Sequence, residues 1–219
     1  MAFGLRMRSF QLGMLVLAGA CQPAAETGED QQTVSAPAEA TASALSAATE
    51  LTCSAPVKPT DTAVSLQQRY GDQARAETLY GPEGIEFPGL VLWPDDPARR
   101  LEVAFIEEEQ HTVSSVMLGR ASNWRIAGLA IGDPLARVNA ANGRPFKLWG
   151  FGWDYGGTVS DLAGGRLAML PGGCRVVMAV GPREDIALPD GLVGDRELSS
   201  DDPRLEAADV MIHELSLGF

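Results

Sequence analysis

Histidine, cysteine and lysine are scarce in this 219-residue sequence, which contains two histidines, three cysteines and two lysines. It also lacks the motifs G-x-S-x-G, H-E-x-x-H, C-x-x-C and S-x-x-K, which position nucleophiles or metal ligands in many enzymes. The sequence therefore predicts a protein that is not an enzyme and holds no cofactor. Catalysis by a pair of carboxylates is not excluded, because spacing in sequence does not show whether two of them flank a cleft.

Basic residues are also in short supply, with 17 lysines and arginines against 29 aspartates and glutamates and a net charge of −12. A surface of this sign repels the phosphates of nucleic acids and the headgroups of anionic lipids. We therefore expect no nucleic-acid partner, and any attachment to a membrane must come from a lipid anchor.

The apolar run at residues 10–18 is far shorter than the ~20 residues of a membrane-spanning helix. Arg6 and Arg8 precede it, and a small-residue cleavage site ending at Ala20 follows it. This pattern predicts a secretory signal peptide over residues 1–20.

The next residue, Cys21, gives the end of this segment a resemblance to the lipobox of bacterial lipoproteins, whose cysteine is acylated and becomes the mature N-terminus. The usual leucine three residues before the cysteine is replaced by Ala18, with Leu17 one place earlier. The resemblance implies lipid attachment at Cys21, and the neutral Gln22 after it implies anchoring to the periplasmic face of the outer membrane. The alternative is a soluble periplasmic protein in which Cys21 is free or paired.

With Cys21 attached to lipid, Cys53 and Cys174 remain as one pair in an oxidising compartment. We expect them to form a disulfide, and two buried free thiols are the alternative. Between Cys21 and Glu50 the chain has almost no large apolar side chain, which predicts a disordered tether over residues 21–52.

The folded region contains a candidate repeat, which becomes visible when the sequence is shifted by 72 residues. Residues 62–70 and 134–142 both read as short helices. An aspartate that can cap the N-terminus precedes each helix, at Asp61 and Asp133, and a glycine follows each of them. We interpret residues 53–119 and 120–219 as two units, and a chance match between them is the alternative.

Runs of apolar and alternating residues predict strands after each helix. The predicted strands cover residues 90–93, 100–105 and 113–118 in the first unit, and residues 146–155, 167–170, 175–180 and 210–219 in the second. The expected fold class is α+β, with two tandem units of a helix plus antiparallel strands and with the helices on one face of the sheet.

The most specific local pattern is the alternation of aromatic residues and glycines over residues 149–157. On a strand, one face would carry the four aromatic residues of this run, Trp149, Phe151, Trp153 and Tyr155. Such a platform favours recognition of a partner, because tryptophan and tyrosine dominate binding hot spots. The alternative is that these rings belong to the core, and Phe151 and Trp153 fit it best.

Weaker patterns predict no metal site. Glu107 and His111 would meet on a helix, but two such residues do not define a site, and a solvated turn explains them. The aspartate pairs at residues 95–96 and 201–202 each precede a proline, which is typical of turns and caps rather than of calcium loops. His213 lies in an apolar run and is expected in the core.

A resemblance to known proteins rests on two motifs, Gly128-Leu-Ala-Ile-Gly132 before a short helix and Asn142-Gly143-Arg144-Pro145-Phe146 after it, followed by the aromatic run. This order resembles the helix-then-sheet module shared by β-lactamase inhibitor protein and a small accessory lipoprotein of the outer-membrane β-barrel assembly machine. The inhibitor carries two such modules in tandem, and the resemblance covers about residues 55–219. The run at residues 149–157 is also similar to that of uncharacterised proteobacterial lipoproteins. No binding residue of these families can be transferred to this sequence.

Together these observations predict a lipid-anchored, non-enzymatic periplasmic module that binds another macromolecule of the cell envelope, with a protein as the expected partner. The alternative is a small-molecule-binding protein or minor enzyme with a pocket between the two units. An open, aromatic-bearing sheet face would favour the first interpretation, and a closed cleft with convergent polar groups the second.

Overall fold

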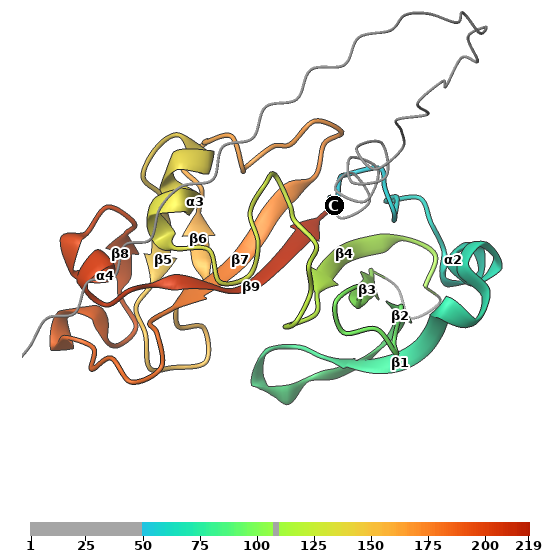
Figure 1. The fold of residues 1–219 in the computed structure, drawn as a ribbon, viewed down its shortest axis with the longest axis horizontal. Coiled ribbons are helices and arrows are strands. Elements are labelled where there is room, and N and C mark those ends of the chain that lie inside the picture. Colours follow the sequence, from blue (N-terminus) through green and yellow to red (C-terminus); the bar gives the residue numbers. More distant parts are fainter. Residues whose placement is uncertain (1–49, 107–109) are drawn as a thin grey trace, which may run out of the picture. The chain divides into compact units, whose positions relative to one another are not determined.

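The computed structural model describes residues 50–106 and 110–219. The predicted signal peptide, the lipid-attachment residue Cys21 and nearly all of the predicted tether lie outside these ranges, as does Glu107. Within them the chain adopts a mixed α and β fold with antiparallel sheets (Figure 1). None of the described helices is long and apolar enough to span a membrane.

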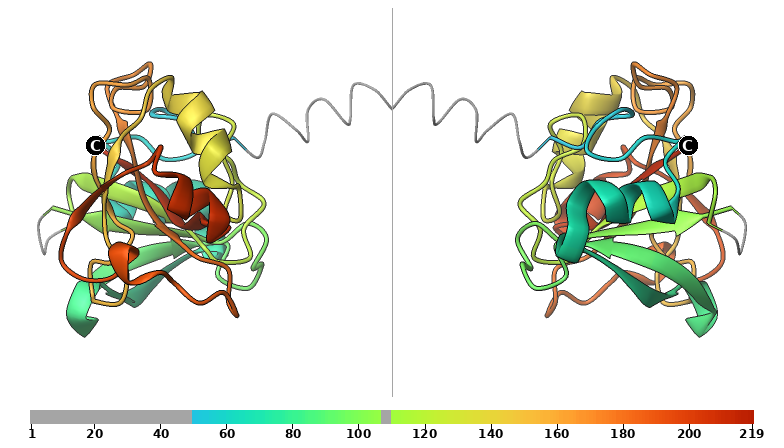
Figure 2. Two further views of the ribbon diagram at one scale, coloured as in Figure 1. Left: turned by 90° about the vertical axis from the view of Figure 1, so that its left-hand side faces the viewer. Right: turned by 90° about the vertical axis from the view of Figure 1, so that its right-hand side faces the viewer.

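The first half of the folded region is a helix followed by four strands. Helix α2 spans Ala63–Tyr70, and the strands are β1 (Ala74–Tyr80), β2 (Glu86–Leu92), β3 (Leu101–Phe105) and β4 (Val113–Leu118). The 3-10 turns Gly71–Gln73 and Pro82–Gly84 lie before and after β1. The helix and the three strands predicted for this half are confirmed, and β1 is an addition to them. Helix α2 packs against β1 and β2 (Figure 2, right).

The second half is more elaborate than its sequence predicts. Its helices are α3 (Leu135–Asn142) and α4 (Pro203–Ala207), its strands are β5 (Lys147–Trp149), β6 (Val159–Asp161), β7 (Arg175–Gly181), β8 (Glu197–Ser199) and β9 (Met211–Gly218), and a 3-10 turn covers Asp190–Leu192. The strand predicted over residues 167–170 is wrong. Its backbone makes only isolated bonds to the start of β7, because Val176 donates to the Leu167 carbonyl and Leu170 donates to the Cys174 carbonyl.

The strands form two antiparallel sheets. The six-stranded sheet has the order β1-β2-β3-β4-β9-β7, and the three-stranded sheet has the order β6-β5-β8. A bridge between Thr158 and Ala179, and a 2.9 Å bond from the Val180 amide to the Gly157 carbonyl, connect the chain next to β6 with β7. Since β9 pairs with β4, strands from both halves of the chain share the six-stranded sheet.

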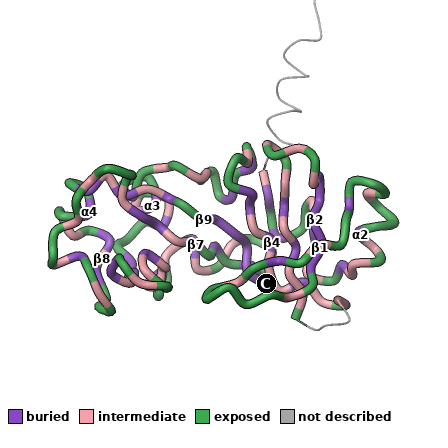
Figure 3. Tube along the Cα trace, turned by 90° about the horizontal axis from the view of Figure 1, so that it is seen from below, coloured by how far each residue is buried: buried purple, intermediate pink, exposed green. Residues whose placement is uncertain are grey.

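One face of the six-stranded sheet forms the main apolar core. Leu90, Val103, Val116, Leu217 and Val176 face one another in a single row across β2, β3, β4, β9 and β7, and all five are buried. The buried stretches of these strands are purple in Figure 3. Alternate residues point to the opposite face, which we call the open face. There the next row carries Glu102, Met117, Ser216 and Val177.

Two strand pairs share a one-residue irregularity. Between β3 and β4 the register skips Ser114, and between β7 and β9 it skips His213. The skip follows four regular pairs between β3 and β4, counted from Leu101, and five between β7 and β9, counted from Arg175. The bulge moves His213 out of the alternation, so this side chain is exposed, and its expected place in the core is wrong.

The two main helices start from similar turns. The carboxylate of Asp61 accepts a bond from the Lys58 amide (2.9 Å), and that of Asp133 accepts one from the Ala130 amide (2.8 Å). The predicted capping role of these aspartates is wrong in detail, because Thr62 and Pro134 occupy the N-cap positions. Each aspartate instead fixes the turn before the cap.

Asp61 also forms an ion pair with Arg69, with 2.9 Å between Oδ2 and Nη1. Burial alone would raise the pKa of Asp61, but the bonds from Arg69 and the Lys58 amide outweigh it and hold this pKa below its ordinary value. Protonation of the carboxylate removes the charge that binds Arg69.

We predict that Asp61→Asn lowers the free energy of unfolding by about 1–3 kcal/mol at pH 7. Because the pKa of Asp61 is lowered by folding, the carboxylate stabilises the fold above the unfolded-state pKa of about 3.9 and loses this effect as pH falls through the folded-state pKa. Urea denaturation of both chains between pH 7 and pH 3 measures the difference, which should shrink on acidification. A difference independent of pH would contradict the role of the charge.

The predicted disulfide between Cys53 and Cys174 is present, with 5.5 Å between the two Cα atoms. Both residues are buried, and the bond joins the segment before α2 to the start of β7. The Leu51 amide also donates to the Arg125 carbonyl at 2.7 Å. The start of the folded region is therefore fixed to the second half of the chain.

Candidate recognition surface

The aromatic run does not form the continuous strand that its alternation predicts. Strand β5 ends at Trp149, and the glycines that follow turn the chain away. Gly152 and Gly157 have φ values of 85° and 79°, a left-handed conformation that glycine adopts readily. A Cβ at Gly157 would lie 1.8 Å from the Val180 carbonyl oxygen, so only glycine lets this loop approach β7.

Because the strand ends early, the four aromatic residues do not share one face. Phe151 is buried and forms a bridge with Val193, so its expected place in the core is confirmed. Trp149 and Trp153 are half-buried, and Tyr155 is 40% exposed. Trp149 lies on the side of β5 opposite to the buried Leu148, because neighbouring side chains of a strand point to opposite faces.

Trp149, Trp153 and Tyr155 form what we call the aromatic cluster. The ring centroids of Trp149 and Trp153 are 6.1 Å apart, and those of Trp153 and Tyr155 are 5.4 Å apart, both in edge-to-face geometry. This geometry is the favoured one for aromatic pairs. The indole nitrogen of Trp153 donates to the Gly150 carbonyl at 2.8 Å, which fixes the central ring.

The aromatic cluster touches the hairpin between β1 and β2. The hydroxyl of Tyr155 donates to a carboxylate oxygen of Glu83 at 3.3 Å. The negative charge of Glu83 raises the pKa of Tyr155, so the phenol stays protonated and available as a donor. Tyr80 and Ile85, which flank the tip of this hairpin, are 66% and 61% exposed. The cluster and the hairpin tip thus place partly exposed aromatic and aliphatic side chains near one contact.

The open face of the six-stranded sheet is polar along its first strands. Arg100 pairs with Glu77 at 2.9 Å and with Glu102 at 3.0 Å, and these charges lie on the same side of the sheet as Val91. Toward β9 and β7 the face carries Ser216 and Val177, of which Val177 is 38% exposed, and it also carries the exposed charged residues Arg175 and Glu214. A partner on this face would therefore meet charged side chains at both ends.

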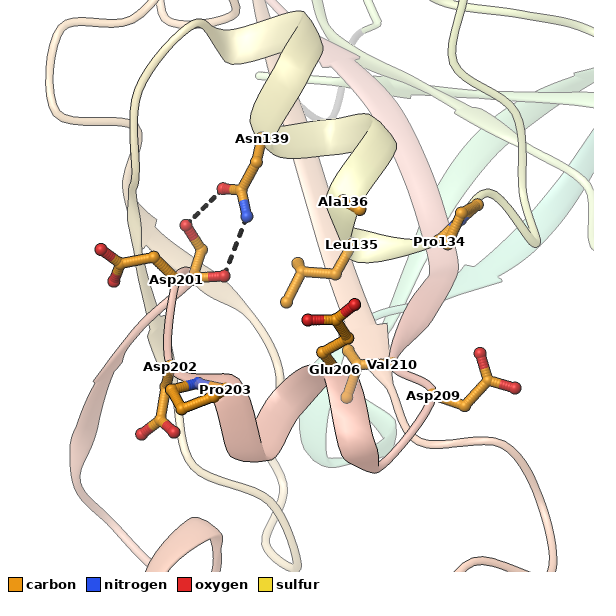
Figure 4. Close-up of a pocket in the computed structure, with 11 residues that line it drawn as sticks. Pro134, Leu135, Ala136, Asn139, Asp201, Asp202, Pro203, Glu206, Asp209 and Val210 are labelled. Carbon is orange, nitrogen blue, oxygen red and sulfur yellow. Dashed lines mark hydrogen bonds between the residues drawn. The ribbon is translucent and has the colours of Figure 1, made fainter.

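A separate cavity of about 380 Å³ lies between α3 and α4 (Figure 4). Its apolar part includes Leu135 and Val210, and four carboxylates line the rest: Asp201, Asp202, Glu206 and Asp209. Asn139 crosses one side, where it donates to the Ser200 carbonyl at 2.9 Å and accepts from the Ser200 hydroxyl at 2.5 Å.

Two of the four carboxylates of this cavity already have cationic partners. Asp202 caps α4 and binds Arg204, which lowers the pKa of Asp202 to about 2, and Asp209 forms an ion pair with Arg183. Asp201 accepts from the Ser199 hydroxyl at 2.5 Å. Among the described residues, no group of three or more metal-ligating side chains has the geometry of a metal site. The N-cap position of Asp202 agrees with the turn and cap interpretation of residues 201–202.

The aspartate pair at residues 95–96 stabilises the turn in which it lies. Asp96 accepts from the Ala98 amide at 3.1 Å, and Asp95 binds Arg75 at 2.9 Å.

The sequence pattern identified the residues of the aromatic cluster, although not their arrangement. It missed Glu83, and no signal marks this residue beyond its place in the Gly-Pro-Glu-Gly turn.

Comparisons of the chain with protein-family models, with curated proteins and with solved structures found no match.

Proposed function

We propose that this chain is a lipid-anchored, non-enzymatic module of the bacterial periplasm that binds another protein of the cell envelope. The aromatic cluster carries this proposal. Partly exposed tryptophan and tyrosine rings on a fixed frame can bury a large area at low entropic cost, which is how such residues come to dominate protein interfaces. The absence of the common catalytic motifs from the sequence supports the non-enzymatic part.

The frame of the aromatic cluster supports a role in recognition. The loop that carries Trp153 and Tyr155 is fixed to β7 through Gly157, and to the core through Phe151. A surface that is already ordered loses little conformational entropy when it binds. The adjoining open face offers further contact area, and a small-molecule pocket between the two halves remains the alternative.

The experiment that tests the partner is site-specific photo-crosslinking in intact cells. A photoreactive phenylalanine in place of Tyr155 should give a crosslinked product of defined mass, whereas the same group at Met169, which is 69% exposed, should not. Trp153→Ala should reduce the yield at residue 155 at least tenfold, because it removes the central ring of the cluster. Equal products at residues 155 and 169, or none at 155, would contradict the proposed binding surface.

The lipid anchor gives an independent prediction. Cys21→Ser should move the protein from the membrane fraction to the soluble periplasmic fraction, because the chain is too acidic to bind anionic lipid by charge. Fractionation followed by immunoblotting measures this. A control variant, Cys53→Ser with Cys174→Ser, should stay in the membrane fraction. Unchanged fractionation of Cys21→Ser would contradict lipid attachment.

We also propose that the fold consists of two tandem repeats, α2-β1-β2-β3-β4 and α3-β5-β6-β7-β9, with their helices on one face of the sheet. Three similarities support this: the turns before the two helices, the order of elements, and the one-residue bulges that skip Ser114 and His213. Four-residue turns with the same backbone bond also open both halves, from Thr52 to Ala55 and from Ile126 to Leu129. In this view β8 and α4 are an insertion in the second repeat.

The hydrogen bond between Glu83 and Tyr155 also fits the duplication, because these residues are 72 positions apart, which is the shift that aligns the two helices. The corresponding hairpin tips of the two repeats would then meet each other at the aromatic cluster. The resemblance to the tandem modules of β-lactamase inhibitor protein stays part of this proposal.

A further inference from the structure

The two proposed repeats differ at one edge. Strand β5 pairs with β8 on its outer side, where Leu148 faces Leu198. Its counterpart β1 pairs with β2 and is the last strand of the six-stranded sheet (Figure 1). The shift of 72 residues aligns Leu148 with Ala76. In the second repeat, β8 therefore occupies the edge that corresponds to the open edge of β1 in the first repeat.

The backbone of β1 presents hydrogen-bonding groups at this edge. The Trp93 amide donates to the Gln73 carbonyl, and the Gly81 amide donates to the Ile85 carbonyl. These bonds show which residues of β1 bond to β2. The backbone N–H and C=O groups of its odd-numbered residues face β2, and those of its even-numbered residues face away from the sheet, toward the open edge. Among the described residues, the outward groups of Ala76 and Thr78 have no hydrogen-bond partner. Strand β5 has the same alternation. The Gly150 amide donates to the Arg196 carbonyl and the Ser200 amide donates to the Phe146 carbonyl, so the backbone N–H and C=O groups of Leu148, between them, face β8.

Apolar side chains next to this edge are also left exposed. Ala76 continues the apolar row that contains Leu90 and Val103, but it is exposed whereas they are buried. Val64 on α2 is 61% exposed, and the residue aligned with it, Ala136, lies beside the segment of β8 and α4 at the α3–α4 cavity. An apolar side chain placed next to Ala76 would extend the buried row, as Leu198 does next to Leu148.

We propose that the outer edge of β1 binds an extended segment of a partner protein, antiparallel to β1, with an apolar residue opposite Ala76. This inference rests on the tandem repeat proposed above, and it adds a second contact to the aromatic cluster. The bound segment forms backbone bonds with Ala76 and Thr78, which supply affinity, and its apolar residue supplies selectivity. A second copy of this chain is disfavoured as the occupant, because two copies of net charge −12 repel each other.

The test uses the full chain with Cys21→Ser, labelled with nitrogen-15, and a synthetic peptide that copies residues 194–202, the segment paired with β5. At millimolar concentration the peptide should slow amide hydrogen exchange at Ala76 and Thr78 at least tenfold. Exchange at Arg75 and Glu77 should not change, because their amides already bond to β2. A peptide with serine at the position of Leu198 should bind at least tenfold more weakly.

Ala76→Pro is the variant that blocks the edge. It removes an outward N–H and leaves the ladder with β2 intact, since proline is tolerated where a strand has no neighbour. It should abolish the effect of the peptide, whereas Ala76→Ser, which keeps the N–H, should retain it. Trp153→Ala should also retain it, so this test succeeds or fails independently of crosslinking at Tyr155.

Three results would overturn the proposal. The first is unchanged exchange at Ala76 and Thr78 with either chain at several millimolar peptide. The second is protection of these amides without peptide at every protein concentration, which would place another segment of the same chain on the edge. The third is protection that grows with protein concentration alone, which would make a second copy the occupant.

Discussion

Replacing both Cys53 and Cys174 by alanine is expected to lower the free energy of unfolding by about 2–5 kcal/mol. The disulfide joins residues 121 positions apart, so it restricts the unfolded chain strongly. It also fixes the segment before α2 to the start of β7, and both cysteines are buried.

Urea denaturation, followed by tryptophan fluorescence, measures this loss. The chain with Cys21→Ser is the control, because it removes a cysteine outside the described residues and should unfold at the same urea concentration as the unchanged chain. Adding a reducing agent to the control should reproduce the midpoint of the double alanine variant. A loss below about 1 kcal/mol would mean that the bond has little effect on the unfolded chain.

The sequence predicts the framework of the fold because local physics dominates there. Alternating apolar residues predict β3 and β4, and the glycine after residue 142 ends α3 in a left-handed conformation, with φ of 81° at Gly143. The pairing of Cys53 with Cys174 follows from counting cysteines. These features depend on a few neighbouring residues or on a simple exclusion, so they can be read from one sequence.

Other features depend on contacts that the sequence does not reveal. The bulge at His213 reverses the alternation of β9, so Ile212 is buried where the unbroken pattern places Met211 and His213 inside. Strand β8 has three residues and forms because β5 offers it an edge. The run from Leu167 to Leu170 has the composition of a strand, but it makes only isolated bonds with β7.

The candidate site shows the same division. Its aromatic residues stand out in the sequence, but their arrangement depends on Gly152 and Gly157, whose positive φ values end the strand pattern. The paired glycines at residues 156–157 were the available signal, because consecutive glycines in a strand pattern often mark a close backbone approach. The contact with Glu83 joins parts of the chain that are far apart in sequence, and nothing local predicts it.

Substitutions of Phe151 and Trp153 should distinguish a role in the core from a role in recognition. Phe151→Ala should lower the free energy of unfolding by about 3–5 kcal/mol, because the ring is buried and its loss leaves a cavity. Trp153→Ala should cost only about 1–2 kcal/mol, since this ring is half-buried and loses one hydrogen bond to Gly150. Urea denaturation gives both values.

For partner binding we expect the reverse, with a larger loss for Trp153→Ala than for Phe151→Ala. At a temperature where both variants are folded, Trp153→Ala should lose crosslinking at residue 155, whereas Phe151→Ala should retain most of it. This expectation follows from geometry, because Trp153 touches Tyr155 edge to face while Phe151 packs into the interior. If instead Trp153→Ala unfolds the chain as readily as Phe151→Ala and folded Trp153→Ala still crosslinks, the whole aromatic run serves the core. The open face and the edge of β1 would then be the surfaces left for a partner.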